Sequence, residues 1–362
     1  MTVIGIAGCT ALIIGGLGLK DSLSVIAPLQ YDELTVYDEI YSLKSGGTVQ
    51  EKAYLMSKFH ADKRFAETAL VDQNNISIQN TQNEKKFNYY YIVASDINDF
   101  EKFFHLRDRV THEKKTLTDN GIIISERISQ LIGAGKGEKA IINIDDTPYT
   151  VDITDIAENY AGNYICMTPA YYEKITGKTN KYHIVYTQLT EDGKQNEKAI
   201  ADEWMEDDDI LTVFLLKEQL EGIISTLDSL NIIVFVVVLC AAMLAMVVLY
   251  NLTNINISER IREIATIKVL GFYDLETASY IYRENIFLTV AGALAGLPLG
   301  TLFISFIIDA LQMEIIMFPK YVTIMSYLIG FALTVVFSLF VNFIMFFRMK
   351  KVSMVESLKS IE

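Results

Sequence analysis

Nineteen consecutive apolar residues, Ile232 to Tyr250, contain no charged side chain and lead into a charged segment. The hydrocarbon core of a bilayer is about 30 Å thick and needs about 20 such residues in a helix. The run is therefore predicted to span a membrane. The segment that follows, Ser258 to Lys268, mixes charged and apolar residues. We expect it to form an amphipathic helix on one side of the membrane, where a soluble protein can push on it.

Three other runs are long and apolar enough to be membrane helices. The predicted spans are residues 1–20, 232–250, 286–308 and 322–347. The first run, Val3 to Leu19, is also compatible with a signal peptide, but it has no basic n-region and no defined cleavage site, so we favour a transmembrane helix. It leaves no room for basic flanking residues. We therefore expect that sequence is missing before Met1, or that the chain is the C-terminal half of a longer protein.

The charges are distributed unevenly along the chain. Residues 1–230 hold 22 Lys and Arg against 36 Asp and Glu, whereas residues 231–362 hold nine of each. An acidic, polar domain is thus joined to a membrane domain, and the acidity argues against binding of nucleic acid. The three cysteines and four histidines have no spacing that indicates a disulfide framework or a metal site.

Residues 21–216 are predicted to form an α/β domain inserted between the first two spans. Stretches rich in β-branched and aromatic residues between turn formers indicate strands, and two short segments indicate helices. The expected strands are 87–94, 122–125, 140–144, 149–156 and 182–188, and the expected helices are 126–132 and 169–176. The glycine-rich segment 133–137 lacks the Lys-Ser/Thr of a phosphate loop and indicates a tight turn. The acidic run 203–209 lacks the ligand spacing of a calcium loop and is expected to be a solvated turn.

Residues 217–231 have apolar residues at helical spacing and no helix breaker before the second span. We expect a helical stalk that continues the membrane helix out of the bilayer. The third span carries Gly292, Gly296 and Gly300, four residues apart, which predicts close packing against another helix. Tolerance of glycine on a lipid-facing surface is the alternative.

The positively charged residues predict the topology. Loop 251–285 and tail 348–362 carry most of the basic residues of the membrane half, and loop 309–321 carries one. We therefore expect residues 251–285 and the C-terminus in the cytoplasm, and residues 21–230 and 309–321 outside. No charged residue lies in the middle of a span, which is unusual for an ion-coupled carrier.

The order of elements resembles the FtsX-like permease family of ABC transporters, which includes MacB-type exporters. The resemblance is carried by Asn251 to Phe272, with its E-R-I-R-E-I sequence followed by a glycine, and by the tail Ser353 to Lys359. The family resemblance implies that a cytoplasmic coupling helix docks on a separate ATPase subunit. The residues expected at this contact are Glu259, Arg260, Ile261, Arg262, Glu263, Ile264, Lys268, Leu270 and Gly271.

The resemblance also implies a function and a set of partners. The chain is expected to be the permease subunit of an ABC transporter in the bacterial cell membrane, where it passes ATPase motion to the outer domain to export or extract a peptide, lipid or lipoprotein-like substrate. The partners are an ABC-type ATPase and a second copy or homologous half of the permease. The chain has no Walker motif, so it is expected to be no enzyme and to bind no cofactor; ATP is used by the partner.

Two alternatives remain open at the level of the sequence. The charged segment after the second span could be an interfacial helix on lipid headgroups, although its nearly balanced charge is not what anionic lipid favours. The chain could instead be a membrane-anchored sensor or structural protein with a ligand-binding outer domain. A hydrolase finds little support, because the sequence shows no Ser/His/Asp constellation, no paired-acid constellation and no metal motif.

Overall fold

The computed structural model of the chain describes residues 2–83 and 85–350. The side chains of several residues between 219 and 281, and of 348–350, are outside this description. The chain forms two compact units. Within the described residues, the membrane unit comprises residues 2–24, 227–311 and 319–350, and the outer domain comprises the described part of 25–226 and residues 312–318.

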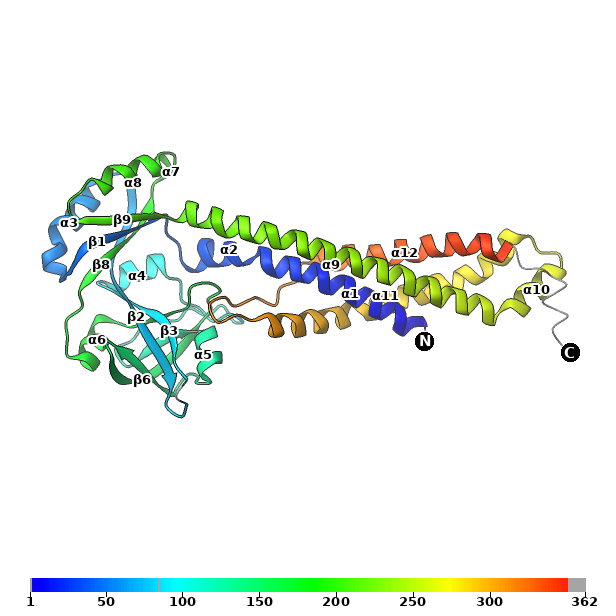
Figure 1. Cartoon of the computed structure of the whole chain (residues 1–362), viewed down its shortest axis with the longest axis horizontal. Coiled ribbons are helices and arrows are strands. Elements are labelled where there is room, and N and C mark those ends of the chain that lie inside the picture. Colours follow the sequence, from blue (N-terminus) through cyan, green and yellow to red (C-terminus); the bar gives the residue numbers. More distant parts are fainter. Residues whose placement is uncertain (1, 84, 351–362) are drawn as a thin grey trace. The chain divides into compact units, whose positions relative to one another are not determined.

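The membrane unit is built from long apolar helices (Figure 1). They are α1 (Thr2–Ser24), α9 (Leu216–Glu259), α11 (Asp274–Leu311) and α12 (Ile324–Lys350), with the short α10 (Ile261–Val269) between α9 and α11. In the described part of the chain, four helical stretches are long and apolar enough to cross a membrane. They are Thr2–Leu34, Phe235–Glu259, Tyr282–Leu311 and Ile324–Phe347. The chain therefore has the helix lengths and the apolar composition of a multi-pass membrane protein.

Two sequence-based boundaries differ from the structure. The stalk predicted at 217–231 and the span predicted at 232–250 are one helix of 44 residues, α9, which continues to Glu259; the stalk side chains from 222 to 231 lie outside the described residues. The stretch predicted as loop 251–285 is mostly helical, because α9 extends into it and α11 already begins at Asp274. Polar residues marked the end of the apolar run, but they do not break a helix.

The three glycines of α11 lie against α1. A Cβ atom placed on Gly292 would lie 2.8 Å from the Cβ of Ile6, and one on Gly300 would lie 2.6 Å from that of Ile14. At Gly296 it would lie 2.7 Å from the carbonyl oxygen of Ala7. Such distances leave no space for any side chain, so the spacing of the glycines allows the two helix backbones to approach closely.

Buried polar side chains add hydrogen bonds between the membrane helices. The hydroxyl groups of Thr10 on α1 and Thr334 on α12 are 3.1 Å apart, and those of Thr289 on α11 and Ser338 on α12 are 2.7 Å apart. Hydrogen bonds of this kind are worth about 0.6 kcal/mol on average in a membrane helix bundle. They link α12 to both α1 and α11.

The outer domain is built on a mixed sheet of nine strands in the described residues. The strands are β1 (Glu39–Gly47), β2 (Phe65–Asn80), β3 (Phe87–Ala94), β4 (Ile122–Ser125), β5 (Lys139–Ile144), β6 (Thr147–Ala157), β7 (Tyr164–Cys166), β8 (Tyr182–Leu189) and β9 (Ile210–Leu215). Their order is β3-β7-β4-β6-β5-β2-β8-β1-β9, and β3 also pairs with β2. The pairing β2–β3 closes six strands into a ring, from which β8, β1 and β9 extend.

The outer domain also contains short helices. They are α2 (Ile26–Pro28), the π-helix η1 (Leu29–Leu34), α3 (Val49–Ala61), α4 (Ile97–Phe103), α5 (Glu126–Ile132), α6 (Pro169–Thr176), α7 (Glu191–Lys194) and α8 (Glu197–Met205). The ends of several are encoded locally. Thr48 and Glu51 form a capping box at the start of α3, and Gly133, with φ of 65°, ends α5 in the left-handed conformation.

Successive residues of the central strands point to opposite faces and build two cores. On β4, Ile122 and Ile124 belong to the core under α5 and α6, whereas Ile123 belongs to the core under α4. A third core lies between α3, α8 and the strands β1, β8 and β9, and it contains Trp204, the one tryptophan of the chain.

The acidic run 203–209 was predicted as a solvated turn, and this is wrong for its first residues. Glu203 and Trp204 belong to α8, and Trp204 is 8% exposed and stacks on Phe59 of α3, with ring centroids 4.0 Å apart. Because most residues of this run are acidic, its composition did not indicate that Trp204 is the buried position of an amphipathic helix. The turn begins only after Met205.

The connection predicted as loop 309–321 also differs from the expectation. Helix α11 continues to Leu311, and residues 312–318 are part of the outer domain. Ile316 forms an antiparallel β-bridge with Ala161, and Met317 packs with Ile26 and Tyr160. Nothing in the composition of this short loop indicated that it would be built into another unit.

Candidate functional site

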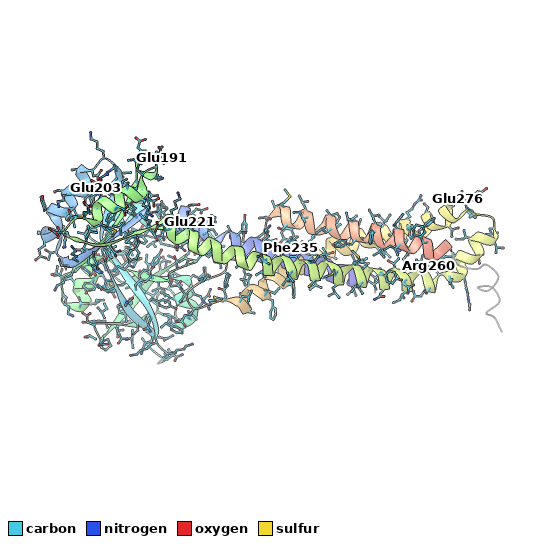
Figure 2. The ribbon with its side chains drawn as sticks, turned by 45° about the horizontal axis from the view of Figure 1, so that its top comes forward. Glu191, Glu203, Glu221, Phe235, Arg260 and Glu276 are labelled. Carbon is cyan, nitrogen blue, oxygen red and sulfur yellow. The ribbon has the colours of Figure 1, made fainter. Side chains whose placement is uncertain are left out.

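The segment 257–287 of the membrane unit contains the residues predicted to couple to a partner. Helix α9 ends at Glu259 and α10 begins at Ile261, so the chain bends at Arg260 (Figure 2). The amide of Arg260 donates to the carbonyl oxygen of Ile257 at 3.2 Å, and the carbonyl oxygen of Arg260 accepts from the amide of Ile264 at 3.0 Å. The two helices are thus joined by a hydrogen-bonded turn.

A tight turn joins α10 to α11. Gly271 has φ of 94°, and the amide of Phe272 donates to the carbonyl oxygen of Ile267 at 3.4 Å. This is the bond of a Schellman motif, which requires the left-handed conformation that glycine adopts at least cost. The amide of Tyr273 then donates to Glu276 at 2.9 Å, which satisfies a free donor at the start of α11. Local sequence therefore fixes the geometry of this turn.

One predicted contact residue faces the interior of the membrane unit. Ile264 is fully buried in a cluster with Ile6 of α1, Leu249 and Ile257 of α9, and Val341 and Met345 of α12. Burying such a side chain contributes about 1.5–3 kcal/mol. Ile264 therefore ties α10 to the long helices, and its side chain is not exposed at the surface where the sequence places the ATPase contact.

Arg260 is also engaged within the chain. Its guanidinium forms an ion pair with both carboxylate oxygens of Glu284 on α11, one of them at 2.7 Å. The charged motif predicts Arg260 at the partner contact. The motif did not indicate that Arg260 pairs with Glu284, because Glu284 lies 24 residues later in the sequence.

Other predicted residues are available at the surface. Glu259, Arg262 and Glu263 are exposed, Ile261 is 36% exposed and Leu270 is 72% exposed. Gly271 forms the turn, and the side chain of Lys268 lies outside the described residues. Together with Leu270, the adjacent Phe272 and Tyr273 are 53% and 78% exposed. We call Leu270, Phe272 and Tyr273 the apolar turn.

A groove of about 1130 Å³ adjoins the apolar turn. Its lining combines apolar and polar side chains of α10, of the turn after it and of α11: Ile267, Phe272, Glu276, Ser279, Arg283, Glu284 and Phe287. Sequence reasoning missed Phe272, Tyr273 and the α11 residues of this surface. The signal that could have found them is the pair of large aromatic residues directly after Gly271 in a polar stretch.

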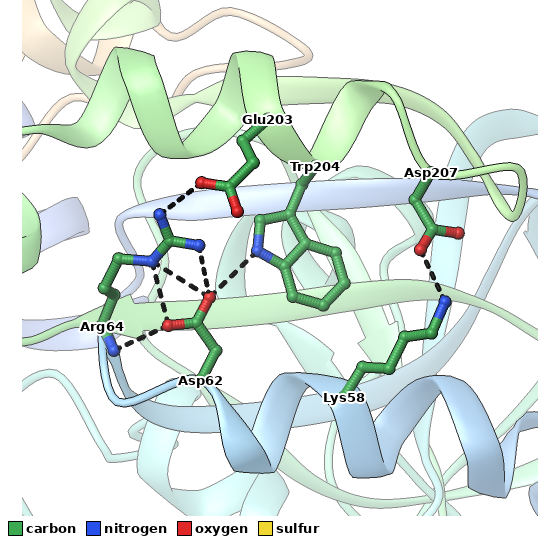
Figure 3. Close-up of a pocket in the computed structure, with 6 residues that line it drawn as sticks. All are labelled: Lys58, Asp62, Arg64, Glu203, Trp204 and Asp207. Carbon is green, nitrogen blue, oxygen red and sulfur yellow. Dashed lines mark hydrogen bonds and ion pairs between the residues drawn. The ribbon is translucent and has the colours of Figure 1, made fainter.

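The outer domain has a charged hollow between α3 and α8, shown in Figure 3. Arg64 forms ion pairs with Asp62 and Glu203 at 2.7 and 2.6 Å, and Lys58 forms one with Asp207 at 2.7 Å. The indole nitrogen of Trp204 donates to Asp62 at 3.3 Å. The charges of this hollow are bound to one another, so it serves to fasten α8 to α3.

A buried carboxyl group lies in the same half of the domain. Glu39 of β1 is fully buried, accepts a hydrogen bond from the hydroxyl of Tyr41 at 2.5 Å, and has no partner in the described residues for its Oε1 atom. Burial raises the pKa of Glu39 to about 7, and the hydrogen bond from Tyr41 opposes this shift only in part. The described residues contain no cluster of side chains that could hold a metal ion.

Comparison with known proteins identifies the C-terminal third of the chain. The family model of the FtsX-like permease C-terminal domain matches residues 235–354. This segment is therefore similar to the FtsX-like permease C-terminal domain, and it includes the whole of α10, the apolar turn and the groove. The resemblance predicted from the sequence is confirmed for these residues. No curated protein sequence matches the chain.

Two solved structures are similar to the outer part of the chain. One is the periplasmic region of MacB from Actinobacillus actinomycetemcomitans, with a TM-score of 0.34 and 10% identity, covering 52% of this chain and 94% of that one. The other is the extracellular domain of the noncanonic ABC-type transporter YknZ from Gram-positive bacteria, with a TM-score of 0.33 and 12% identity, covering 49% of this chain and 100% of that one.

Proposed function

We propose that this chain is the permease subunit of an ABC transporter, which passes the motion of a separate ATPase to its outer domain. The observation that carries the proposal is the FtsX-like permease match over residues 235–354. The substrate class is a peptide, lipid or lipoprotein-like molecule, moved by export or by extraction. The working unit contains two permease modules, either two copies of this chain or two homologous halves.

The proposed orientation places residues 251–285 and the C-terminus in the cytoplasm of a bacterial cell and residues 21–230 outside the cell membrane. The distribution of basic residues supports this orientation. The apolar turn and its groove would then face the cytoplasm, where a soluble ATPase can bind them. Large exposed apolar side chains rimmed by charged residues are typical of protein interaction sites.

The contact is proposed to rest on the apolar turn and not on the charged motif alone. Leu270 and Tyr273 are 72% and 78% exposed, so a partner could bury most of each side chain. At about 25 cal/mol per Å² of buried apolar surface, such side chains supply more binding energy than exposed ion pairs, which contribute about 0–1 kcal/mol each. Arg262 and Glu263, which are exposed on α10, would set the register of docking.

The structure of the coupling segment supports a mechanical route. Ile264 fixes α10 to α1, α9 and α12, and the Arg260–Glu284 ion pair links the α9–α10 bend to α11. A push on the apolar turn would therefore move several membrane helices together. Because α9 extends from Leu216 to Glu259 and follows directly on β9, a displacement of α9 would act on the end of that strand.

The test is co-purification from native membranes of the wild type and of Leu270→Asp/Tyr273→Asp, with Val110→Asp as the control. Val110 is a 75% exposed residue of the outer domain. The control therefore adds an exposed charge at a position distant in the sequence from the apolar turn. We expect an ATPase to co-purify with the wild type and with the control. The amount of co-purified ATPase should fall at least tenfold with the double variant. If no ATPase accompanies the wild type, the permease proposal fails and a membrane-anchored sensor or structural protein becomes the better account.

A further inference from the structure

Gln30 connects the segment that follows α1 to the body of the outer domain. It lies in the π-helix η1 and is 2% exposed. Its Nε2 atom donates to Oδ1 of Asn159 at 2.9 Å, and its Oε1 atom accepts from the amides of Tyr160 and Ala161 at 2.8 and 3.0 Å. One side chain thus satisfies both backbone donors of a buried turn. Single π-helical turns occur frequently at functional positions.

Asn159 and Asn163 continue this set of hydrogen bonds. Both are buried, and Nδ2 of Asn159 donates to Oδ1 of Asn163 at 3.4 Å. Nδ2 of Asn163 in turn donates to the carbonyl oxygens of Glu314 and Ile315 at 3.0 and 3.2 Å. We call Gln30, Asn159 and Asn163 the amide relay. It runs without interruption from the segment after α1 to the segment between α11 and α12.

The segment 312–318 is held at further points within the outer domain. Nε of Arg127 donates to the carbonyl oxygen of Met313 at 2.6 Å, and the amide of Met317 donates to the carbonyl oxygen of Tyr160 at 2.9 Å. Met317 is 4% exposed and belongs to a small core with Ile26, Leu34 and Tyr160. A surface loop whose only task is to join two helices needs none of these contacts.

The hydrogen bonds of the amide relay favour a single arrangement of the segments that it connects. A hydrogen bond contributes about 0.5–1.5 kcal/mol net, but a buried amide left without a partner costs about 1–3 kcal/mol. The Nδ2 group of Asn163 and the Oε1 atom of Gln30 each serve two partners. Displacing either segment would break several bonds at once, so the relay resists partial opening.

We propose that the amide relay is a clamp that makes the α11–α12 connection and the segment after α1 move as one piece with the outer domain. The proposal rests on the proposed function and adds to it. Motion of the membrane helices would reach the domain through α9 and also through these two chain connections. Asn163 is then a positioning residue for force transmission, since it holds the backbone of 314 and 315.

The clamp can be tested by hydrogen–deuterium exchange of the full-length chain with its ATPase in nanodiscs, with and without ADP-vanadate. The variants are Asn163→Ala, and Asn163→Ala with Ala161→Cys and Ile316→Cys, all in a Cys240→Ser background. Ala161 and Ile316 are partners of an antiparallel β-bridge, whose Cα spacing suits a disulfide. Asn180→Ala is the matched control, because Asn180 is a buried amide of the same domain that binds Asp72 instead.

In the wild type we expect slow exchange at 312–318 in both states and nucleotide-dependent changes in the outer domain. Asn163→Ala should raise exchange at 312–318 at least tenfold and reduce the nucleotide-dependent changes by more than half, while ATP hydrolysis stays within about twofold. The disulfide should restore slow exchange at 312–318 and the nucleotide-dependent changes in the outer domain. Asn180→Ala should leave these two properties unchanged. If Asn163→Ala keeps the full nucleotide response, or the disulfide fails to restore it, the clamp does not transmit motion. If the wild type shows no nucleotide response, the proposed function itself is overturned, and the clamp with it.

Discussion

Arg260, at the bend between α9 and α10, holds the carboxylate of Glu284 on α11 through both of its terminal guanidinium nitrogens. The ion pair links the bend between α9 and α10 to α11. The charged motif that identifies this region in the sequence is therefore partly an internal structural element. In the proposed function, the partner would bind the surface that this ion pair helps to shape.

Reversing the charge of Arg260 should weaken partner binding through geometry. Arg260→Glu places two carboxylates together, and the exchange Arg260→Glu/Glu284→Arg should restore the ion pair and most of the binding. Because both side chains are partly exposed, the effect on the free energy of unfolding should be small, about 0–1 kcal/mol. Co-purified ATPase measures the binding. Equal loss in the single and the exchanged variant would show that Arg260 contacts the partner directly.

Gly296 should tolerate no side chain. Gly296→Ala places a Cβ 2.7 Å from the carbonyl oxygen of Ala7, so α1 and α11 must separate, at a cost of about 1–3 kcal/mol. Gly8→Ala on α1 is the matched control, because its Cβ would meet nothing within 4 Å. Thermal unfolding in detergent measures both variants. A Gly296→Ala protein as stable as Gly8→Ala would contradict the packing of α1 on α11.

The core beside the charged hollow should depend on Phe59. Its ring is fully buried and stacks on Trp204 at 4.0 Å, so Phe59→Ala should destabilise the outer domain by about 3–5 kcal/mol. Tyr54→Ala, on the same helix but 71% exposed, should change stability little. The fluorescence of the single tryptophan reports unfolding at this site. A similar unfolding midpoint for the two variants would show that α3 is not fastened there.

The stability of the outer domain should fall as the pH rises from about 4.5 to about 7. Burial raises the pKa of Glu39 to about 7, above its ordinary value of 4.5, so the folded state binds a proton that the unfolded state has released. Glu39→Gln removes this group, and the pH slope should become shallower. Some slope should remain, because burial also raises the pKa of Asp72 and Glu197. Unfolding midpoints at pH 5 and pH 8 provide the measurement, and an unchanged slope would mean that Glu39 ionises normally.

The sequence predicted those parts of the fold that local pattern determines. Continuous apolar runs predicted the four membrane spans, and β-branched clusters predicted strands such as β3 and β4. It did not predict β1, β2, β7 or β9. Strand β2 contains polar residues in its second half, and besides the neighbouring β3 it pairs with β5 and β8, which lie far away in the chain. Such pairings leave little trace in local composition.

The coupling role of the segment 251–285 stays a prediction, and the sequence did not predict the contacts within it. The bend at Arg260 and the turn at Gly271 depend on neighbouring residues. The burial of Ile264 and the pairing of Arg260 depend on α12 and α11, which come later in the chain. The incorporation of 312–318 into the outer domain has the same cause, since Asn163 and Gln30 are more than 100 residues away from it.

The most direct test of the proposed function is photo-cross-linking from the apolar turn in intact cells. A benzoyl-phenylalanine placed at Tyr273, which is 78% exposed, should form a cross-link to one protein of the cytoplasm. The same probe at Val110 in the outer domain should not form this product. We expect mass spectrometry to find an ATPase with a Walker motif in the Tyr273 product. Cross-links to lipid alone would support an interfacial helix, and a partner without an ATPase motif would contradict the permease account.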